Sequence, residues 1–537
     1  MTRLLQDWVV EQAQRRPEAT AVVSTAARLT YGELDTLSSQ LARVLKEAGC
    51  QRFDRVALLL PSSPMAIAGL LGIYKAGGIY VPLDAASPVA RLKKILDSCE
   101  NQWLLAAAPV TPVVQELFED EEYRQRLRVG WLDHAAPVGD GFRADFTLDD
   151  VRRAPAAPID CRRDSDVPAH ILFTSGSTGM PKGVVLSHAN VIHFIEWAVG
   201  YFGIESSDRA PALPPLHFDM SMLDIFSMMA AGGELHLIPK ELHLLPQKLA
   251  EFIRTAQLTQ LYVVPAILNL LAKFNAVRQN DFPAMRRVIW AGDVLPTPAL
   301  IYWMQRLPHV SFTNLYGPTE TAISSSYYTV PECPRDPQAA IPIGVGCAGE
   351  ELLVLDESLR PAATGEIGDL YIGGVGVALG YWRDAERTAQ SFLRDPRNPS
   401  QRLYKTGDLA RVGDNGQVYF LGRKDFQVKS RGYRIELGEI ETAVNAIDGI
   451  LECAVVGVRT GGFEGVAICC AYVTQPGEKM TPSAIRRALS RAVPPYMLPT
   501  RWQAFDVFPK NASGKIDRRR LQDIFAGSVD TRAAQTA

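Results

Sequence analysis

The feature that most constrains the fold is a regular alternation of short apolar, β-rich runs with segments of helical hydrophobic spacing. Residues 55–60 (RVALLL) are typical of a buried strand, and residues 64–75 then have the spacing of a helix. Gly77-Gly78 ends that helix before a second expected strand at residues 79–83. Further strands of this kind are expected at residues 170–174, 260–265, 287–292 and 310–317. Strands that alternate with helices at this scale predict an α/β fold built from two doubly wound sheets.

The pattern changes after about residue 342. Residues 342–420 contain short strands and many glycines, which predicts a small β-barrel or sheet. Beyond it, after Gly422, helices at 437–446 and 482–492 and strands at 451–458 and 465–473 predict a separate, small α+β domain. The tail after Phe525 is small and polar, and we expect it to be disordered.

Length, charge and cysteine usage exclude several classes of protein. With 537 residues and roughly 150 residues per domain, the chain is long enough for three to four globular units. Its 56 basic and 59 acidic residues give a formal charge of −3, which indicates neither nucleic acid nor an anionic membrane as the main partner. The eight cysteines form no C-x-x-C pair, which disfavours zinc and disulfides and suits a reducing cytosol. The sequence has no signal-peptide core and no run of about 18 apolar residues, so we expect a cytoplasmic protein.

A glycine- and hydroxyl-rich loop, TSGSTGMPKG at residues 174–183, follows an expected strand. Its hydroxyls and amides are suited to hold phosphate oxygens, and Lys182 adds a cation. The other residues of this candidate phosphate loop are Thr174, Ser175, Gly176, Ser177, Thr178 and Gly179. It is not a Walker A loop, because Gly183 rather than Ser or Thr follows Lys182. The alternative interpretation is a flexible surface turn.

Four more motifs follow this loop in order: NLYGPTE at 314–320, YKTGDLAR at 404–411, GRKDFQVKSRGYRIELGEIE at 422–441 and NASGKIDR at 511–518. With these motifs the chain resembles, over essentially its whole length, the adenylate-forming superfamily of acyl-CoA synthetases, luciferases and nonribosomal-peptide adenylation enzymes. The resemblance implies that the carboxylate of an acid attacks the α-phosphate of ATP and releases pyrophosphate. Because two anions must meet, cations and hydrogen-bond donors must offset their charge.

The resemblance also implies roles for the residues of NLYGPTE. Glu320 matches the magnesium ligand, and a carboxylate is a ligand that Mg²⁺ prefers. Thr319 is expected to donate to the α-phosphate, Tyr316 to lie flat on the adenine and Asn314 to contact its polar edge. The alternative for Glu320 is a solvated loop acid.

The later motifs supply the remaining nucleotide and catalytic residues that the resemblance implies. Asp408 corresponds to the carboxylate that accepts the ribose hydroxyls, and Arg423 to a basic residue near the ribose and phosphates. Tyr419 either lines the adenosine site or packs in a strand core. Lys515 matches the lysine that enters the cleft between the substrate carboxylate and the α-phosphate. Asp425 matches the hinge about which the small domain turns after the adenylate forms. The resemblance therefore implies an N-terminal core over residues 1–424 and a mobile C-terminal lid domain over residues 425–537. An ordinary turn residue is the alternative for Asp408, and an ordinary loop residue is the alternative for Asp425.

Asp219, in the segment HFDMSMLDIF, bears on the choice of acid. It matches the aspartate that amino-acid-activating members place against the substrate's amino group. A buried carboxylate facing a cationic amine forms an ion pair, and would be costly if left alone. The alternative is a side-chain N-cap for the helix that follows.

The other expected pocket residues carry no charge and little polarity, which predicts a small apolar side chain on the substrate. They are Met220, Leu223, Tyr262, Ile289, Ala291, Leu315, Ile323 and Ser324, with Lys515 reaching the substrate carboxylate. This set is similar to the pockets of free-standing prolyl adenylation enzymes. Trp290, beside Ala291, either packs outward in the core or narrows the site.

The sequence therefore favours a ligase for L-proline that uses ATP and Mg²⁺. No carrier-protein segment is recognisable, so we expect a free-standing enzyme that passes the prolyl group to the phosphopantetheine thiol of a separate peptidyl carrier protein. Such chemistry is typical of nonribosomal peptide synthesis and antibiotic biosynthesis. Adenylation of another small apolar amino acid and an acyl- or aryl-CoA ligase remain alternatives. A luciferase-like oxygenase is disfavoured by Asp219, and a non-enzymatic nucleotide-binding module by Glu320 and Lys515.

Overall fold

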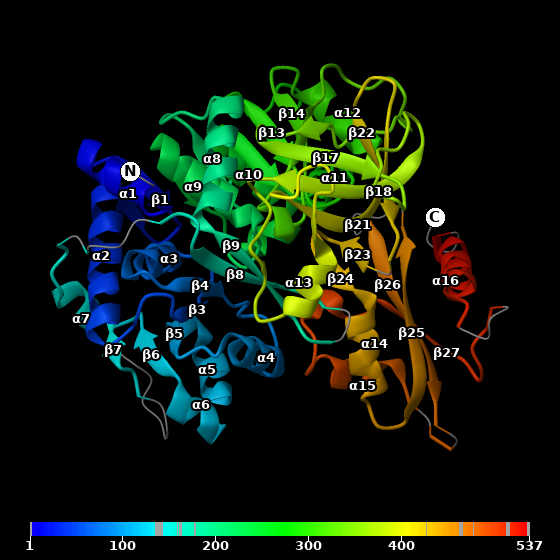
Figure 1. Ribbon diagram of the computed structural model, residues 1–537, viewed down its shortest axis with the longest axis horizontal. Helices are drawn as coiled ribbons and strands as arrows, with labels where there is room; N and C mark the ends of the chain where they lie inside the picture. The colour runs from blue at the N-terminus through cyan, green and yellow to red at the C-terminus, as the bar shows by residue number, and fades with distance from the viewer. Residues whose placement is uncertain are drawn as a thin grey trace. The chain divides into compact units, whose positions relative to one another are not determined.

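The computed structural model describes residues 3–134, 143–157, 159, 164–176, 179–425, 427–460, 465–475, 477–478, 480–511 and 516–533 (Figure 1). Contacts between residues divide the chain into two compact units. The first comprises Met1–Ala85, Leu96–Phe173 and Gly183–Gly422, and the second Ala86–Ile95, Thr174–Lys182 and Arg423–Ala537.

The largest sheet of the first unit consists mainly of parallel strands. Its order is β19 (Gly380–Tyr381), β9 (Lys182–Ser187), β8 (Pro168–Thr174), β4 (Ile79–Pro82), β3 (Arg55–Leu59), β5 (Trp103–Ala106), β6 (Arg128–Trp131) and β7 (Phe146–Thr147). Parallel neighbours require crossover connections, and helices supply them here. The strands predicted at residues 55–60 and 79–83 are β3 and β4.

A second sheet carries the parallel strands β12, β13 and β14 side by side. Its order is β12 (Gln260–Val263), β13 (Arg287–Trp290), β14 (Ser311–Tyr316), β15 (Ser326–Thr329) and β16 (Val345–Gly346). A third sheet has the order β10 (Arg209–Ala212), β11 (Glu234–Leu237), β1 (Thr20–Val23) and β2 (Arg28–Thr30). These crossover-linked sheets confirm the predicted α/β fold.

The helices of the first unit are apolar on the side that meets the sheets, and none among the described residues is long and apolar enough to cross a membrane. They are α1 (Asp7–Arg15), α2 (Tyr31–Glu47), α3 (Pro64–Ala76), α5 (Thr111–Leu117), α6 (Glu121–Arg126), α7 (Leu148–Arg153), α8 (His188–Phe202), α9 (Met220–Ala231), α10 (Pro246–Thr255), α11 (Pro265–Lys273), α12 (Thr297–Arg306) and α13 (Ala385–Ser391), and α4 (Val89–Cys99) runs from one unit into the other. Helices α2 and α3 lie side by side (Figure 1). A Cβ at Gly72 would lie 2.8 Å from Leu41 Cδ2, so glycine permits this close approach.

The β-rich part of the first unit is an antiparallel sheet. Its order is β17 (Glu350–Leu355), β18 (Ile367–Gly374), β21 (Arg402–Val412) and β20 (Phe392–Arg394), and β22 (Val418–Arg423) also pairs with β21. Within the described residues β17 and β20 end the path of hydrogen-bonded strands, so of the two predicted forms, a small barrel or a sheet, the structure has the sheet. No pairing closes it, because β17 hydrogen-bonds along the sheet only to β18.

The second unit is a small α+β structure. It contains β23 (Gln427–Ser430), β24 (Tyr433–Glu436), α14 (Leu437–Asn445), β25 (Ile450–Arg459), β26 (Val466–Thr474), α15 (Pro482–Leu489), β27 (Arg501–Ala504) and α16 (Arg518–Ala533). The expectation of a disordered tail after Phe525 is wrong, because α16 continues to Ala533. Leu521 and Phe525, one helical turn apart, are buried against β25 and β26 and hold this helix in place.

Candidate active site

Neighbouring strands of the second sheet bring together residues predicted for the substrate pocket. Tyr262 on β12 and Ile289 on β13 are direct partners in the strand register. Trp290, the next residue along β13, faces the other side of the sheet because strand side chains alternate. It is buried there in a separate apolar cluster with Trp303 and Phe312. Trp290 therefore packs outward in the core and does not narrow the pocket.

Helix α9 and the loops after β13 and β14 complete the apolar part of this pocket. The predicted apolar residues all lie in one buried cluster: Met220, Leu223, Tyr262, Ile289, Ala291, Leu315 and Ile323. Ser324 is buried too. The structure thus brings the predicted pocket residues into a common core region, from segments up to a hundred residues apart.

Asp219 precedes α9 and is 8% exposed. Its backbone is already helical (φ −58°, ψ −32°), and its side chain makes no capping hydrogen bond to the helix. The alternative role as a side-chain N-cap is therefore not observed. The Asp219 charge raises the pKa of Tyr262, which burial has already raised well above its ordinary value. The carboxylate of Asp219 thus lies close to the Tyr262 hydroxyl.

The segment after β14 turns back sharply on itself. The amide of Ser325 donates to the carbonyl of Tyr316 at 2.8 Å, and a short 3₁₀ turn, η3 (Thr319–Thr321), lies between them. A Cβ at Gly317 would lie 2.5 Å from Ser324 Cα, so only glycine fits there.

Two further residues of this turn have positive φ angles without being glycine: Ala322 at 53° and Ile323 at 72°. Such conformations cost about 1–3 kcal/mol each and persist where the surroundings enforce them. The chain then returns so that Ser324 lies against Gly317, and one turn carries predicted pocket residues and, between them, the residues predicted for the nucleotide.

Two residues predicted for the adenosine are in direct contact. The Tyr316 hydroxyl donates to the Asp408 carboxylate, and the Asp408 amide donates to Thr406 Oγ1 at 3.0 Å. Asn314 donates through its side-chain amide to the Pro342 carbonyl at 2.9 Å, which fixes the orientation of that amide.

The structure does not place Tyr419 with Tyr316 and Asp408. Its hydroxyl accepts from Asn415 Nδ2 at 3.1 Å, and the Arg411 guanidinium lies 5.0 Å from its ring centre. The neighbouring Phe420 meets Tyr316 instead, with ring centres 6.3 Å apart. Successive side chains of a strand point to opposite faces of the sheet, so Tyr419 and Phe420 on β22 face opposite ways. This two-residue period is the signal in the sequence that distinguishes the two residues.

Glu320 is fully buried. The Tyr381 hydroxyl donates to its Oε1 at 2.9 Å, and the Ala378 amide donates to its backbone carbonyl at 2.9 Å. Tyr381 is a contact that sequence reasoning missed, since nothing in the order of the motifs links the two residues. Among the described residues no cluster of three acidic, histidine or cysteine side chains could hold a metal. A single oriented carboxylate fits Mg²⁺, which binds through one or two carboxylates, water and substrate phosphates.

The candidate phosphate loop belongs to the second unit. Thr174 Oγ1 is buried and has no hydrogen-bond partner among the described residues. Ser175 Oγ donates to the Arg434 carbonyl at 2.8 Å, and the Gly176 amide donates to Glu439 Oε2 at 3.3 Å. Ser177 and Thr178 lie outside the described residues.

The rest of this loop is held at its far end. Gly179 has φ +78°, and its carbonyl accepts from Lys94 Nζ at 3.1 Å. Lys182 is the first residue of β9. Glu439, which sequence reasoning missed, forms a buried ion pair with Arg91 while it accepts from the Gly176 amide. The Glu439 carboxylate therefore accepts a hydrogen bond from a backbone amide of the loop, which is the kind of donor that binds phosphate.

Arg423 and Asp425 form a two-point ion pair, with distances of 2.7 and 2.6 Å. Burial raises the pKa of Asp425, but the hydrogen bonds and charge of Arg423 outweigh it, and the pKa is lowered. The Gln427 amide also donates to Asp425, at 3.1 Å. Lys515, the predicted catalytic residue, lies outside the described residues.

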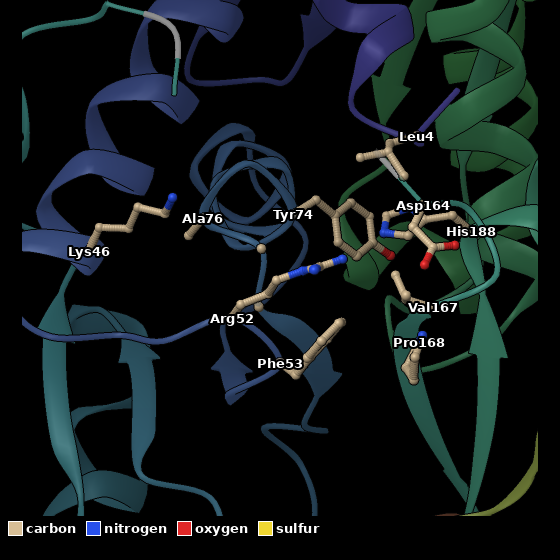
Figure 2. Close-up of a pocket in the computed structure, with 12 residues that line it drawn as sticks. Leu4, Lys46, Arg52, Phe53, Tyr74, Ala76, Asp164, Val167, Pro168 and His188 are labelled. Carbon is tan, nitrogen blue, oxygen red and sulfur yellow. The ribbon is translucent and has the colours of Figure 1, made fainter. Parts of the chain in front are cut away.

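A cavity in the first unit contains none of the predicted site residues (Figure 2). Tyr74, His188 and Arg52 are among the side chains that line it. Burial lowers the pKa of His188 to about 3, and its Nδ1 accepts from the Leu5 amide at 3.3 Å. His188 is therefore a neutral, hydrogen-bonded structural histidine at neutral pH.

Comparisons with known proteins agree with these observations. The family model described as AMP-binding enzyme matches residues 9–382, and the model of the AMP-binding enzyme C-terminal domain matches residues 439–515. Surfactin synthase subunit 2 of Bacillus subtilis (strain 168) is 35% identical over 511 residues, which is 95% of this chain and 13% of that protein. Tyrocidine synthase 1 of Brevibacillus parabrevis is 32% identical over 513 residues, 96% of this chain and 44% of that protein. The chain thus spans less than half the length of these relatives.

Solved structures show the same fold. The Vibrio cholerae adenylation domain AlmE, in complex with glycyl-adenosine-5'-phosphate, superimposes with a TM-score of 0.83 at 25% identity and covers 97% of this chain and 98% of its own. An artificially fused adenylation–PCP di-domain, NpsA-ThdA from Klebsiella oxytoca, gives a TM-score of 0.77 at 24% identity, with 94% of each chain covered.

Proposed function

Because the chain belongs to the AMP-binding enzyme family, we propose that it is an adenylate-forming ligase of the nonribosomal-peptide type and that it activates L-proline. ATP and proline give prolyl-AMP and pyrophosphate, and the prolyl group then passes to the phosphopantetheine thiol of a separate peptidyl carrier protein. The observation that carries the proposal is Asp219, a buried carboxylate that does not cap its helix and precedes a helix whose first residues, Met220 and Leu223 among them, are buried and apolar.

The choice of proline rests on charge and volume together. A buried carboxylate is costly unless a cation neutralises it, which a substrate ammonium does and a fatty or aryl acid does not. Tyr262, Ile289 and Leu315 are bulky and buried, so they favour a small apolar side chain. The structural neighbour AlmE is in complex with glycyl-adenosine-5'-phosphate, the adenylate of a small amino acid, which supports a small amino acid as the substrate.

In the first step a proline carboxylate oxygen attacks the α-phosphorus, and the bond from that phosphorus to the pyrophosphate oxygen breaks. Asp408 binds the ribose hydroxyls and Tyr316 lies against the adenine. Thr319 donates to the α-phosphate, and the phosphate loop with Lys182 holds the outer phosphates. Glu320 would hold Mg²⁺, which supplies positive charge to the phosphate oxygens when bound. Lys515 offsets the repulsion between the substrate carboxylate and the α-phosphate.

In the second step the carrier thiol, as thiolate, attacks the prolyl carbonyl carbon. The bond from that carbon to the phosphate oxygen of AMP breaks, and AMP leaves with the negative charge on its phosphate group. We assign the change between the two steps to a rotation of residues 425–537 against residues 1–424 about Asp425. The adenylation–PCP fusion among the structural neighbours supports a carrier protein as the acceptor.

Amino-acid-dependent exchange of pyrophosphate into ATP tests the proposal. The panel is the proteinogenic amino acids together with acetate, benzoate and a fatty acid. A sharp maximum with L-proline is the expected result. A maximum with another amino acid would retain adenylation and refute proline, and exchange only with acids that lack an amine would refute the role of Asp219.

A further inference from the structure

The segment that follows β18 contacts Glu320, the residue expected to hold Mg²⁺, at two points. The Ala378 amide donates to the Glu320 carbonyl at 2.9 Å, and the Tyr381 hydroxyl donates to Glu320 Oε1 at 2.9 Å. One hydrogen bond fixes the backbone of Glu320 and the other fixes the end of its side chain. Residues 374–381, which we call the strap, therefore determine where this carboxylate points.

Two buried side chains anchor the first half of the strap. The Asn190 side-chain amide donates to the Val375 carbonyl at 2.6 Å and to the Val377 carbonyl at 3.4 Å. The Gly376 amide donates to Glu350 Oε1 at 2.7 Å. Asn190 belongs to α8 and Glu350 to β17, so the strap is held from two elements before it reaches Glu320.

The second half of the strap is attached to the largest sheet. Strand β19, which includes Tyr381, pairs antiparallel with β9. The Arg402 guanidinium donates to the carbonyls of Ala378 and Leu379 at 2.7 and 3.1 Å. The Tyr381 ring packs edge-on against Phe392, with ring centres 5.4 Å apart. Backbone pairing and ring packing therefore hold Tyr381 in place independently of its hydroxyl.

The strap lies directly against the turn that carries Glu320. A Cβ at Gly376 would lie 2.9 Å from the Thr321 carbonyl oxygen and 3.0 Å from Glu350 Oε1, so a larger residue would push the strap away from the turn. Glu320 itself is fully buried. A buried carboxylate depends on protein donors in place of water, and Tyr381 supplies such a donor.

We propose that Tyr381 is a positioning residue for Mg²⁺: its hydroxyl, held by the strap, fixes the Glu320 carboxylate in the orientation in which that carboxylate binds the metal. Carboxylates that bind metals are themselves hydrogen-bonded, and loss of such a partner weakens the metal site. A carboxylate has about four lone-pair positions, so donation from Tyr381 is compatible with a metal at the same group. This inference rests on the proposed function, in which Glu320 holds Mg²⁺.

Binding of the non-hydrolysable analogue α,β-methylene-ATP to the full chain, measured by isothermal titration calorimetry, tests the inference without turnover. The dissociation constant is measured in EDTA and in saturating Mg²⁺, and the ratio of the first to the second reports how much the metal strengthens nucleotide binding. Tyr381→Phe keeps the ring and removes the hydroxyl. It should lower this ratio about 10- to 100-fold by weakening binding in Mg²⁺, with binding in EDTA unchanged.

Tyr123→Phe is the matched control. The Tyr123 hydroxyl also donates to a carboxylate, that of Asp97, at 2.7 Å, and Tyr123 is 3% exposed. The residue has no part in the proposed site, so its variant should keep the wild-type ratio even though it loses the same kind of hydrogen bond.

Two further variants connect the effect to the strap and to Glu320. Glu320→Gln should remove most of the metal effect, and the double variant Tyr381→Phe/Glu320→Gln should have the same ratio as Glu320→Gln alone, because both changes act through one carboxylate. Thermal unfolding reports whether each variant folds. Arg402→Leu, which removes both donors to the strap carbonyls, should lower the ratio severalfold and carries the test if Tyr381→Phe does not fold.

The inference is overturned if Tyr381→Phe keeps the wild-type ratio, if it weakens binding equally in Mg²⁺ and in EDTA, or if the double variant has a lower ratio than Glu320→Gln alone. In these cases a wild-type ratio that Glu320→Gln abolishes still supports Glu320 as the ligand, so the proposed function stands. A wild type without a metal effect, or a Glu320→Gln variant that retains it, would refute the proposed role of Glu320 together with the inference.

Discussion

The Tyr316 hydroxyl donates a hydrogen bond to the Asp408 carboxylate, although 92 residues separate the two in the chain. Both side chains are buried, so the carboxylate is oriented before any nucleotide arrives. A hydrogen bond to a charged group contributes about 1.5–3 kcal/mol. We therefore expect Tyr316→Phe to raise KM for ATP about tenfold and Asp408→Asn to raise it more. KM for the amino acid is the internal control; an equal rise in both constants would contradict a role confined to the nucleotide.

Asp219→Ala removes the proposed partner of the substrate ammonium. Truncating one member of a buried charge pair typically costs about 2–5 kcal/mol. The expected result is a fall in kcat/KM for proline of about a hundredfold or more in pyrophosphate exchange, with KM for ATP unchanged. A variant as active as the wild type would instead support a CoA ligase for an acid without an amine.

Lys515→Ala tests the two half-reactions separately. If Lys515 is the cation that offsets the repulsion between the two anions, as proposed, its removal should lower the rate of adenylation about 10²- to 10³-fold. Transfer from supplied prolyl-AMP to the carrier protein should be nearly unaffected. Arg519→Ala, at an exposed cation close by in sequence, is the control and should leave both rates unchanged. Equal loss of both half-reactions in Lys515→Ala would contradict the assignment.

Gly317→Ala should disrupt the turn after β14. The new Cβ would lie 2.5 Å from Ser324 Cα, a backbone atom that cannot move aside alone. We expect a loss of several kcal/mol in stability and a rise in KM for both ATP and the amino acid. Gly200→Ala in α8 is the matched control, because a Cβ there meets nothing within 4 Å. By removing backbone entropy from the unfolded chain it should be neutral or stabilise by about 0.5–1 kcal/mol. Differential scanning calorimetry and pyrophosphate exchange measure both effects.

Glu350 predicts a specific pH dependence of stability. Burial raises its pKa from 4.5 to about 8, although the Gly376 amide donates to it. His193 Nε2 lies 3.6 Å from its Oε1, and Cys347 is also near. Because the folded-state pKa is the higher one, its contribution to stability is complete below pH 4.5 and is lost as the pH rises through 8.

Glu350→Gln removes that titration. Its melting temperature should therefore rise relative to the wild type by a few degrees between pH 5 and pH 8.5. Glu351→Gln changes the exposed neighbouring acid and should show no such trend. A constant difference between Glu350→Gln and the wild type across this range would contradict the raised pKa.

Short-range patterns predicted much of this structure. The alternation of strands and helices gave the α/β sheets, and the motif residues Tyr316 and Asp408 proved to be in contact. The three-dimensional partners of such residues were not predictable, since the Tyr381 hydroxyl on Glu320 and the carboxylate of Glu439 on Gly176 depend on how distant segments pack.

Two other misses have simpler physical causes. Helix α16 continues past Phe525 because Leu521 and Phe525 are buried against strands far earlier in the chain, whereas the tail sequence itself is polar. The complete burial of Asp224 was not predictable either, because an acid in a helical segment is ordinarily solvated.

The turn between Tyr316 and Ser325 constrains how this enzyme can diverge. Leu315, Ile323 and Ser324 bracket the residues assigned to the nucleotide, and the backbone hydrogen bond from Ser325 to Tyr316 closes the turn that carries both sets. We therefore expect substitutions at these substrate positions to change KM for ATP as well. Met220, Leu223 and Tyr262 lie outside this turn, on α9 and β12. New substrate preferences should therefore arise first at Met220, Leu223 and Tyr262, and an engineer who diversifies those positions should obtain more active descendants than one who begins in the turn.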